Sequence, residues 1–100
     1  LYIDDAIEAI IKSIKKKNSK GKIINIGSGK PIKLKKIMKI VEKKIKNFNP
    51  VYNKLRLRKD EPKIVYPNKN LAKKVLIWNN RTSFNKGIKK TINYYKKSFL

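Results

Sequence analysis

Apolar residues recur at helical spacing in two long stretches of the first half of the chain. The first stretch predicts an amphipathic helix over residues 4–17, with Asp4 or Asp5 capping its N-terminus. The second predicts a helix over residues 33–46, ended by the turn-forming residues 47–50. Each stripe is typical of a helix that packs one face on a core. The two stripes consist of Ala6, Ile7, Ile10, Ile11 and Ile14, and of Leu34, Ile37, Met38, Val41 and Ile45.

The last third of the chain contains two further helix signals around the single tryptophan. Asn68 can cap a brief helix that runs through Ile77, and Ser83 can cap a last helix. Trp78 stands between these helices, a position that favours a packing anchor over a base-stacking role. The residues expected to face inward are Leu71, Ala72, Val75 and Leu76 in the brief helix, and Phe84, Ile88, Thr91, Ile92 and Tyr95 in the last one.

Short apolar runs between the helices predict extended segments. Residues 22–26 indicate a short buried strand, and residues 51–58 and 64–66 indicate extended pieces on either side of a charged loop. The order helix, strand, helix, strand, helix, helix predicts an incomplete α/β unit. We expect the chain to begin inside a longer protein, because Leu1 rather than Met leads straight into the first helical pattern. Within residues 51–58, the apolar positions expected to face the same way are Val51, Leu55 and Leu57.

The net charge of +22 admits two explanations. Dense lysine can bind a nucleic-acid backbone through counterion release. However, the chain has 25 Lys and only three Arg, whereas a base-reading surface favours the bidentate contacts of arginine. Lys, Ile and Asn together fill 52 of the 100 positions, as A/T-rich codons would produce, and the lysines are spread over every segment. We therefore interpret the basic surface mainly as a solvated face.

Several kinds of chemistry need residues that this chain lacks. It has no Cys and no His, which excludes disulfides, thiolate zinc sites and histidine-activated nucleophiles. The six carboxylates are too scattered to predict a metal site. No Tyr is followed four residues later by Lys, and the four glycines form no dinucleotide fingerprint. We predict neither catalytic residues nor a cofactor site within this chain.

Residues 27–30 (Gly-Ser-Gly-Lys) imitate a phosphate-binding loop, because they lie between a predicted strand and a predicted helix. The full pattern requires glycine where Ile24 stands and Ser or Thr where Pro31 stands. Proline also removes an N–H that an anion-cradling loop would use. The segment therefore predicts a tight turn and not a nucleoside triphosphate site.

Arg58 lies in a polar loop, residues 58–62, that follows an extended segment. A guanidinium group there can form two hydrogen bonds to a diphosphate, while a carboxylate three residues later can accept hydrogen bonds from ribose hydroxyls. An ordinary exposed loop with a salt bridge is the alternative, and spacing alone favours it.

Four short motifs follow one another along the chain. They are LYIDDAIEAI at residues 1–10, INIGSGKPI at residues 24–32, the segment 58–78, and the segment 81–95. In this order and spacing they resemble the C-terminal part of the extended short-chain dehydrogenase/reductases, especially the nucleotide-sugar epimerase and dehydratase group. Two positions depart from the family pattern. Lys33 replaces a Ser or Thr helix cap, and Ile77 replaces a glycine that favours a left-handed conformation, so we expect a strained or rebuilt helix end there.

The resemblance implies an α/β fold, in which residues 1–100 form the last sheet strand and the mostly helical substrate-binding lobe of a Rossmann-type enzyme. It places the NAD-binding part and the catalytic residues in sequence absent from this chain, within a cytoplasmic, homodimeric parent enzyme. It also implies a nucleotide-sugar substrate, with a UDP-sugar as the leading candidate, and neither a nucleic-acid nor a membrane partner. A basic nucleic-acid-binding module and an inactive truncated remnant are the alternatives.

The same resemblance assigns roles to the polar loop. Arg58 is expected to contact the diphosphate of the nucleotide, and an acid that follows it is expected to contact the nucleoside ribose. Counting back from Tyr66 and Trp78 makes Glu61 that acid, whereas a gap of one residue makes it Asp60. Both assignments stay open.

Overall fold

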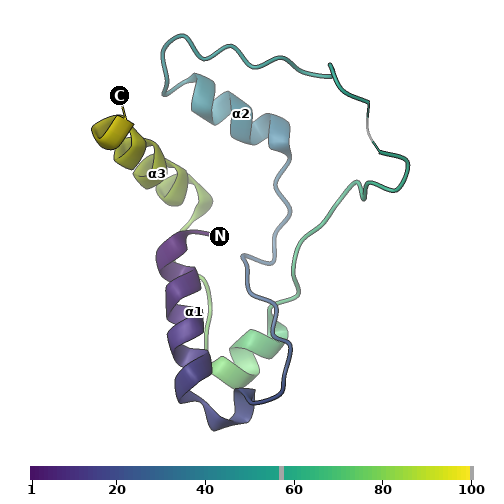
Figure 1. The fold of residues 1–100 in the computed structure, drawn as a ribbon, viewed down its shortest axis with the longest axis vertical. Coiled ribbons are helices and arrows are strands. Elements are labelled where there is room, and N and C mark those ends of the chain that lie inside the picture. The colour runs from purple at the N-terminus through teal and green to yellow at the C-terminus, as the bar shows by residue number, and fades with distance from the viewer. Residues whose placement is uncertain (57, 100) are drawn as a thin grey trace. The chain divides into compact units, whose positions relative to one another are not determined.

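The computed structural model describes residues 1–56 and 58–99 and divides the chain into two units. The first unit joins Leu1–Lys30 to Tyr66–Leu100, and the second is Pro31–Val65. The first unit contains the helices α1 (Ile3–Lys15) and α3 (Phe84–Phe99), the 3-10 turn η1 (Lys17–Ser19) and the π-helical turn η2 (Ala72–Leu76). The second unit contains the helix α2 (Leu34–Glu42) (Figure 1). These described residues form no β-strand, so the α/β assignment remains a prediction.

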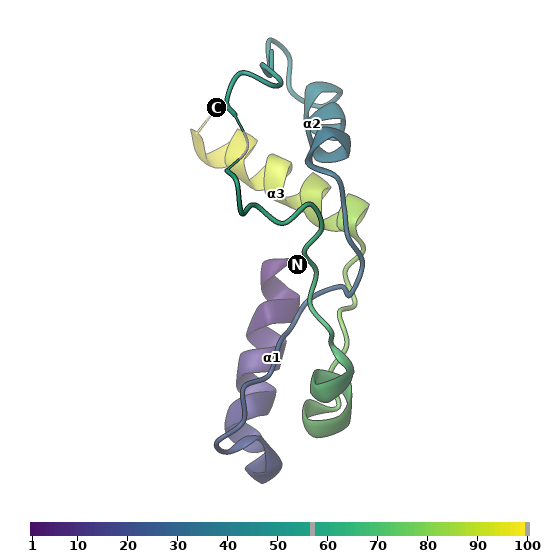
Figure 2. The ribbon, with the colours of Figure 1, turned by 90° about the vertical axis from the view of Figure 1, so that its right-hand side faces the viewer.

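The turn η2 lies beside the C-terminal half of α1 in both views of the ribbon (Figures 1 and 2). A small apolar core forms between them. Trp78 is 1 % exposed at its centre, which confirms the expected packing anchor. The predicted cap at Asn68 is not the N-cap of η2, which is Leu71 and makes no side-chain cap bond. Asn68 Oδ1 instead accepts a hydrogen bond of 2.9 Å from the amide of Asn70, just before the turn. The core comprises Ala9, Ala72, Leu76 and Trp78, with Ile24, Ile26 and Val75 packed against it.

Helix α1 has nearly its predicted bounds but buries a different face. Its buried residues are Asp5 and Ala9, whereas Ile14, in the expected stripe, is 80 % exposed. The expected burial of the isoleucine stripe is therefore wrong for this unit. The predicted aspartate cap is wrong as well, because Tyr2 occupies the N-cap and no side chain bonds the first turn. The first-turn acids and the last-turn lysines still complement the helix dipole.

Residues 22–26 do not form the predicted strand, since no other described segment pairs with them. Their side chains nevertheless alternate as in extended backbone. Ile24 and Ile26 pack on the core, while Ile23 between them is 91 % exposed. The segment therefore packs alternate side chains on the core, as a strand would. It is not a strand, because no described segment pairs with it through the backbone hydrogen bonds of a sheet.

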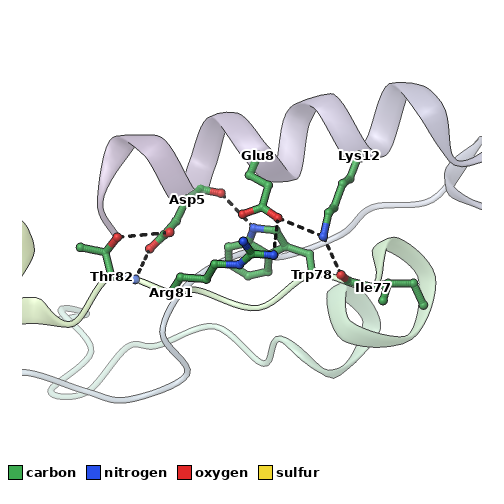
Figure 3. A network of polar contacts seen from close by, with 7 residues as sticks. All are labelled: Asp5, Glu8, Lys12, Ile77, Trp78, Arg81 and Thr82. Atoms are coloured by element: carbon green, nitrogen blue, oxygen red, sulfur yellow. Dashed lines mark hydrogen bonds and ion pairs between the residues drawn. The ribbon is translucent and has the colours of Figure 1, made fainter.

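The buried carboxylate of Asp5 connects the two ends of the sequence (Figure 3). Its Oδ2 accepts a hydrogen bond of 3.0 Å from the amide of Thr82, and its Oδ1 accepts one of 3.3 Å from the Thr82 hydroxyl. The Trp78 indole donates a hydrogen bond of 2.9 Å to the Asp5 carbonyl oxygen. Asp5 is only 3 % exposed, so its carboxylate lies in a setting shielded from water, where an unpaired polar group is costly. The bond from Trp78 is buried, and the two bonds from Thr82 are part-buried. We call Asp5, Trp78 and Thr82 the interlock.

A second, more exposed group of contacts extends the interlock along α1 (Figure 3). Glu8 Oε1 lies 3.0 Å from Lys12 Nζ and 3.4 Å from Arg81 Nη2. The Lys12 ammonium also donates a hydrogen bond of 2.7 Å to the carbonyl oxygen of Ile77. Because these groups are partly exposed, we expect each ion pair to contribute less stability than the buried bonds of Asp5.

Helix α3 begins at the predicted cap, since the amide of Lys86 donates to the Ser83 hydroxyl at 3.3 Å. Gly87 faces Tyr2, where an added Cβ would lie 3.4 Å from the tyrosine side chain. The expected apolar stripe is only partly buried. Ile92 is buried and Phe84 and Ile88 are half-buried, whereas Thr91 and Tyr95 are exposed.

In the second unit, α2 is shorter than predicted and is followed by a series of turns. Lys33 occupies its N-cap and makes no side-chain cap bond. Asn47 has φ +61°, in the left-handed region, at the predicted end of the segment. Residues 51–56 form no regular element, and Leu57 lies outside the described residues.

Ile77 ends η2 in the left-handed conformation, with φ +52° and ψ +45°. This confirms the strained helix end expected from the missing glycine. A β-branched residue is disfavoured there because its side chain crowds the backbone. Ile77 is 66 % exposed, so its side chain recovers little of that cost by burial.

Replacing Asp5 by Ala should destabilise the first unit strongly. The change leaves the part-buried amide and hydroxyl of Thr82 without their acceptor, which should cost about 1–3 kcal/mol of unfolding free energy. The matched control is Asp4→Ala, which removes the other first-turn acid with its exposed ion pair of 3.7 Å to Lys90 and should cost about 1 kcal/mol or less. Urea unfolding followed by Trp78 fluorescence measures both. Equal effects of the two variants would contradict the role assigned to Asp5.

Replacing Ile77 by Gly should stabilise the protein by about 1 kcal/mol, because glycine adopts the left-handed conformation without steric cost. Ile77→Ala is the control, since it removes the exposed side chain but keeps the Cβ atom that causes the strain. Thermal unfolding should show a higher Tm for the glycine variant and a clearly smaller change for the alanine variant. A glycine variant less stable than the parent would show that no strain is present.

Candidate functional site

The polar loop of the second unit closes on itself through Arg58 and Glu61. The amide of Glu61 donates a hydrogen bond of 3.1 Å to the Arg58 carbonyl oxygen, which is the bond of a tight turn. In return, the amide of Arg58 donates one of 3.3 Å to Glu61 Oε2. The turn therefore fixes the backbone of both residues while their side chains stay exposed.

Within the described residues, the Arg58 guanidinium forms no ion pair with a carboxylate. The salt bridge expected for an ordinary exposed loop is therefore not formed among the described residues. The five N–H donors of the guanidinium can instead bind an anion. Glu61 uses one carboxylate oxygen in the turn, whereas Asp60 lies exposed at its tip. Both acids retain an oxygen that can accept a hydroxyl hydrogen bond, so the geometry does not choose between them.

Residues 27–30 form a turn, as predicted, and the structure gives it two causes. Gly27 lies so close to Pro67 that a Cβ there would overlap the proline ring. Gly29 has φ +70°, which favours glycine. The Ser28 hydroxyl is hydrogen-bonded to the amide of Lys30 at 3.2 Å, which occupies an N–H that an anion would need. The residues present therefore do not fit a dinucleotide or a triphosphate.

Tyr52, in the second unit, lies in a setting unlike that of a proton-transfer phenol. Burial raises the pKa of its hydroxyl, and the carboxylate of Glu42 raises it further. A phenol that exchanges protons near neutral pH needs the opposite shift. The residue four positions later is Arg56 rather than Lys, as the sequence already showed.

Sequence reasoning missed a cluster of basic and amide side chains in the first unit. Lys69 Nζ donates hydrogen bonds of 2.7 Å to Asn79 Oδ1 and 2.8 Å to Asn80 Oδ1. Burial lowers the pKa of Lys69, and the charges of Lys73 and Lys30 lower it further. The two asparagines follow Trp78 directly, and that adjacency is the signal that could have pointed to them.

The described part of the chain offers neither a cluster of metal ligands nor a membrane-spanning helix. It contains no group of three or more carboxylate, imidazole or thiol side chains that could hold a metal ion. None of its helices combines the length and the apolar character needed to cross a membrane.

Comparison with known proteins points to enzymes that act on nucleotide-linked sugars. The chain is 35 % identical over 99 residues to a UDP-glucuronate 4-epimerase of Thermodesulfobacterium geofontis, a match that covers 97 % of the chain and 29 % of the relative. It is 30 % identical over 95 residues to a CDP-abequose synthase of Salmonella muenchen, covering 93 % of the chain and 32 % of that protein. The chain thus spans about a third of the length of these curated relatives.

No protein-family model matches the chain, and no solved structure matches it significantly. The two relatives support a relationship to the epimerase/dehydratase group without singling out one member. They agree with the resemblance that the four motifs indicate, over nearly the same extent of sequence.

Proposed function

We propose that this chain is the C-terminal, substrate-binding portion of an NAD-dependent nucleotide-sugar epimerase or dehydratase. The observation that carries the proposal is the similarity of nearly the whole chain to two proteins named for UDP-glucuronate and CDP-abequose. The four motifs support it, because they occur in the family's order. NAD would be held by sequence outside this chain, since its own glycine turn does not fit a dinucleotide.

Within this proposal, Arg58 binds the diphosphate of the nucleotide sugar. Its guanidinium has no carboxylate partner among the described residues, and the Arg58–Glu61 turn fixes the backbone that carries it. A planar guanidinium forms two parallel hydrogen bonds to phosphate oxygens, which sets orientation as well as charge. Glu61 or Asp60 would accept a hydrogen bond from the ribose and thereby hold the nucleoside beside the diphosphate.

Other parts of the proposal concern the whole protein. The exposed isoleucines of α1 and the unpartnered segment 22–26 fit a unit that packs against further sequence. A homodimeric, cytoplasmic enzyme that uses a UDP-sugar belongs to the same proposal. In this account the surplus of lysine is a solvated surface without a specific partner.

Arg58→Ala in the complete protein should weaken UDP-sugar binding by about tenfold to a hundredfold, because it removes charge-assisted hydrogen bonds worth about 1.5–3 kcal/mol. NAD binding should stay unchanged. Isothermal titration calorimetry with a UDP-sugar, and separately with NAD, measures both effects. Arg56→Ala is the matched control, since it removes the same charge two residues away.

The same titrations show whether Asp60 or Glu61 is the acid that binds the ribose. Of Asp60→Asn and Glu61→Gln, only the change at the ribose-binding position should lower UDP-sugar affinity. Equal loss of UDP-sugar and NAD binding in Arg58→Ala, or loss of neither, would refute the site. Steeply salt-dependent binding of any DNA or RNA, with no affinity for nucleotide sugars, would favour the nucleic-acid-binding alternative instead.

A further inference from the structure

The first unit contains an open hollow of about 440 Å³ between α1, η2 and the segment that follows Trp78. Lys12 borders it from α1, Lys73 from η2, and residues 77–81 from the connecting segment. Its volume is within the range of small-molecule pockets. The hollow belongs to a different unit from Arg58, so it is not part of the loop described above.

Three of the five polar side chains that line the hollow carry a positive charge, and the other two are neutral amides. Lys12, Lys73 and Arg81 line it, and Glu8 is the carboxylate that contacts two of them. Lys73 is exposed and forms no ion pair with a described carboxylate, so its charge is not offset locally. Burial lowers the pKa of nearby Lys69, and the positive charge of Lys73 lowers it further.

Several donors at the hollow are held in place before any ligand arrives. Lys12 Nζ is fixed by Glu8 and by the carbonyl oxygen of Ile77. The Oδ1 atoms of Asn79 and Asn80 both accept hydrogen bonds from Lys69, which leaves their NH₂ groups free to donate elsewhere. Donors fixed in this way lose little conformational entropy when a ligand binds.

We propose that this hollow binds a phosphate or diphosphate group of a small molecule. Lys73 and Arg81 would supply the charge, and Asn79 and Asn80 would supply neutral donors. Exposed lysines are frequent on this chain, but here cations and amides from three segments border one concave surface. Ile77, which is 66 % exposed, also lines the hollow and would provide an apolar contact for the carbon skeleton of the ligand.

The experiment uses inorganic pyrophosphate as the probe and the single tryptophan as the reporter. Trp78 lines the hollow, so ligand binding should change its fluorescence. Titration of the protein at about 0.15 M salt, where long-range screening is strong, separates a local site from general attraction. Lys73→Gln should weaken pyrophosphate binding by about tenfold, the loss expected for one charge-assisted hydrogen bond.

Lys74→Gln is the matched control, because this neighbouring lysine carries the same charge but does not line the hollow. It should leave the affinity within about twofold of the parent, an energy difference below about 0.5 kcal/mol. Circular dichroism and thermal unfolding check that both variants keep the fold. A second variant, Asn79→Ala, should also weaken binding, since it removes one oriented donor.

Three results would overturn the proposal. The first is equal weakening by Lys73→Gln and Lys74→Gln, which would reveal general electrostatic attraction. The second is no saturable fluorescence change at millimolar pyrophosphate. The third is tight binding of a single-stranded oligonucleotide that competes with pyrophosphate and is equally sensitive to Lys73→Gln, which would assign the hollow to nucleic-acid phosphates. Failure here would leave the Arg58 assignment untouched, because the two sites share no residue.

Discussion

The buried carboxylate of Asp5 is the interaction on which the first unit depends. It accepts both hydrogen bonds of Thr82, a residue 77 positions away, while the carbonyl of the same aspartate accepts the indole N–H of Trp78. The apolar core around it is small, with four buried members in its central cluster. In such a small core, hydrophobic burial alone stabilises weakly. Directional hydrogen bonds to the buried Asp5 therefore determine how α1 packs on the segment that follows η2.

This constraint explains why the buried face of α1 differs from its most hydrophobic face. Asp5 and Ala9 stand one helical turn apart, and both turn toward Trp78 and Thr82. The isoleucine stripe is consequently left exposed, as is Ile23 in the unpartnered segment. Under the proposed function, both exposed surfaces would pack against further sequence of the parent enzyme. The positively charged hollow lies beside the interlock, because Trp78 belongs to both.

Local signals in the sequence predicted local structure well. Helical spacing located α1 and α3, and the side chain of Ser83 caps its helix as expected. The absence of glycine at position 77 predicted strain, which the left-handed backbone of Ile77 bears out. Long-range pairing was not predictable in this way. Nothing in the spacing of residues 1–10 shows that Asp5 bonds Thr82, and residues 22–26 carry a strand pattern whose partner is not among the described residues.

The candidate site was predictable only through the resemblance. Composition and spacing favoured an ordinary exposed loop at Arg58. The structure shows that Glu61 accepts a hydrogen bond from the Arg58 amide, a contact that both an ordinary turn and a binding loop can contain. The basic hollow was missed because its cations come from segments far apart in the sequence. A charge of +22 spread over every segment conceals such a local convergence.

Hydrogen exchange at the Trp78 indole N–H and the Thr82 amide, followed by NMR, tests the central claim most directly. If the interlock holds the first unit together, both hydrogens should exchange slowly and with the same opening free energy as the amides in the middle of α1. Exchange of either hydrogen at the rate of an exposed group, while α1 stays protected, would contradict the account.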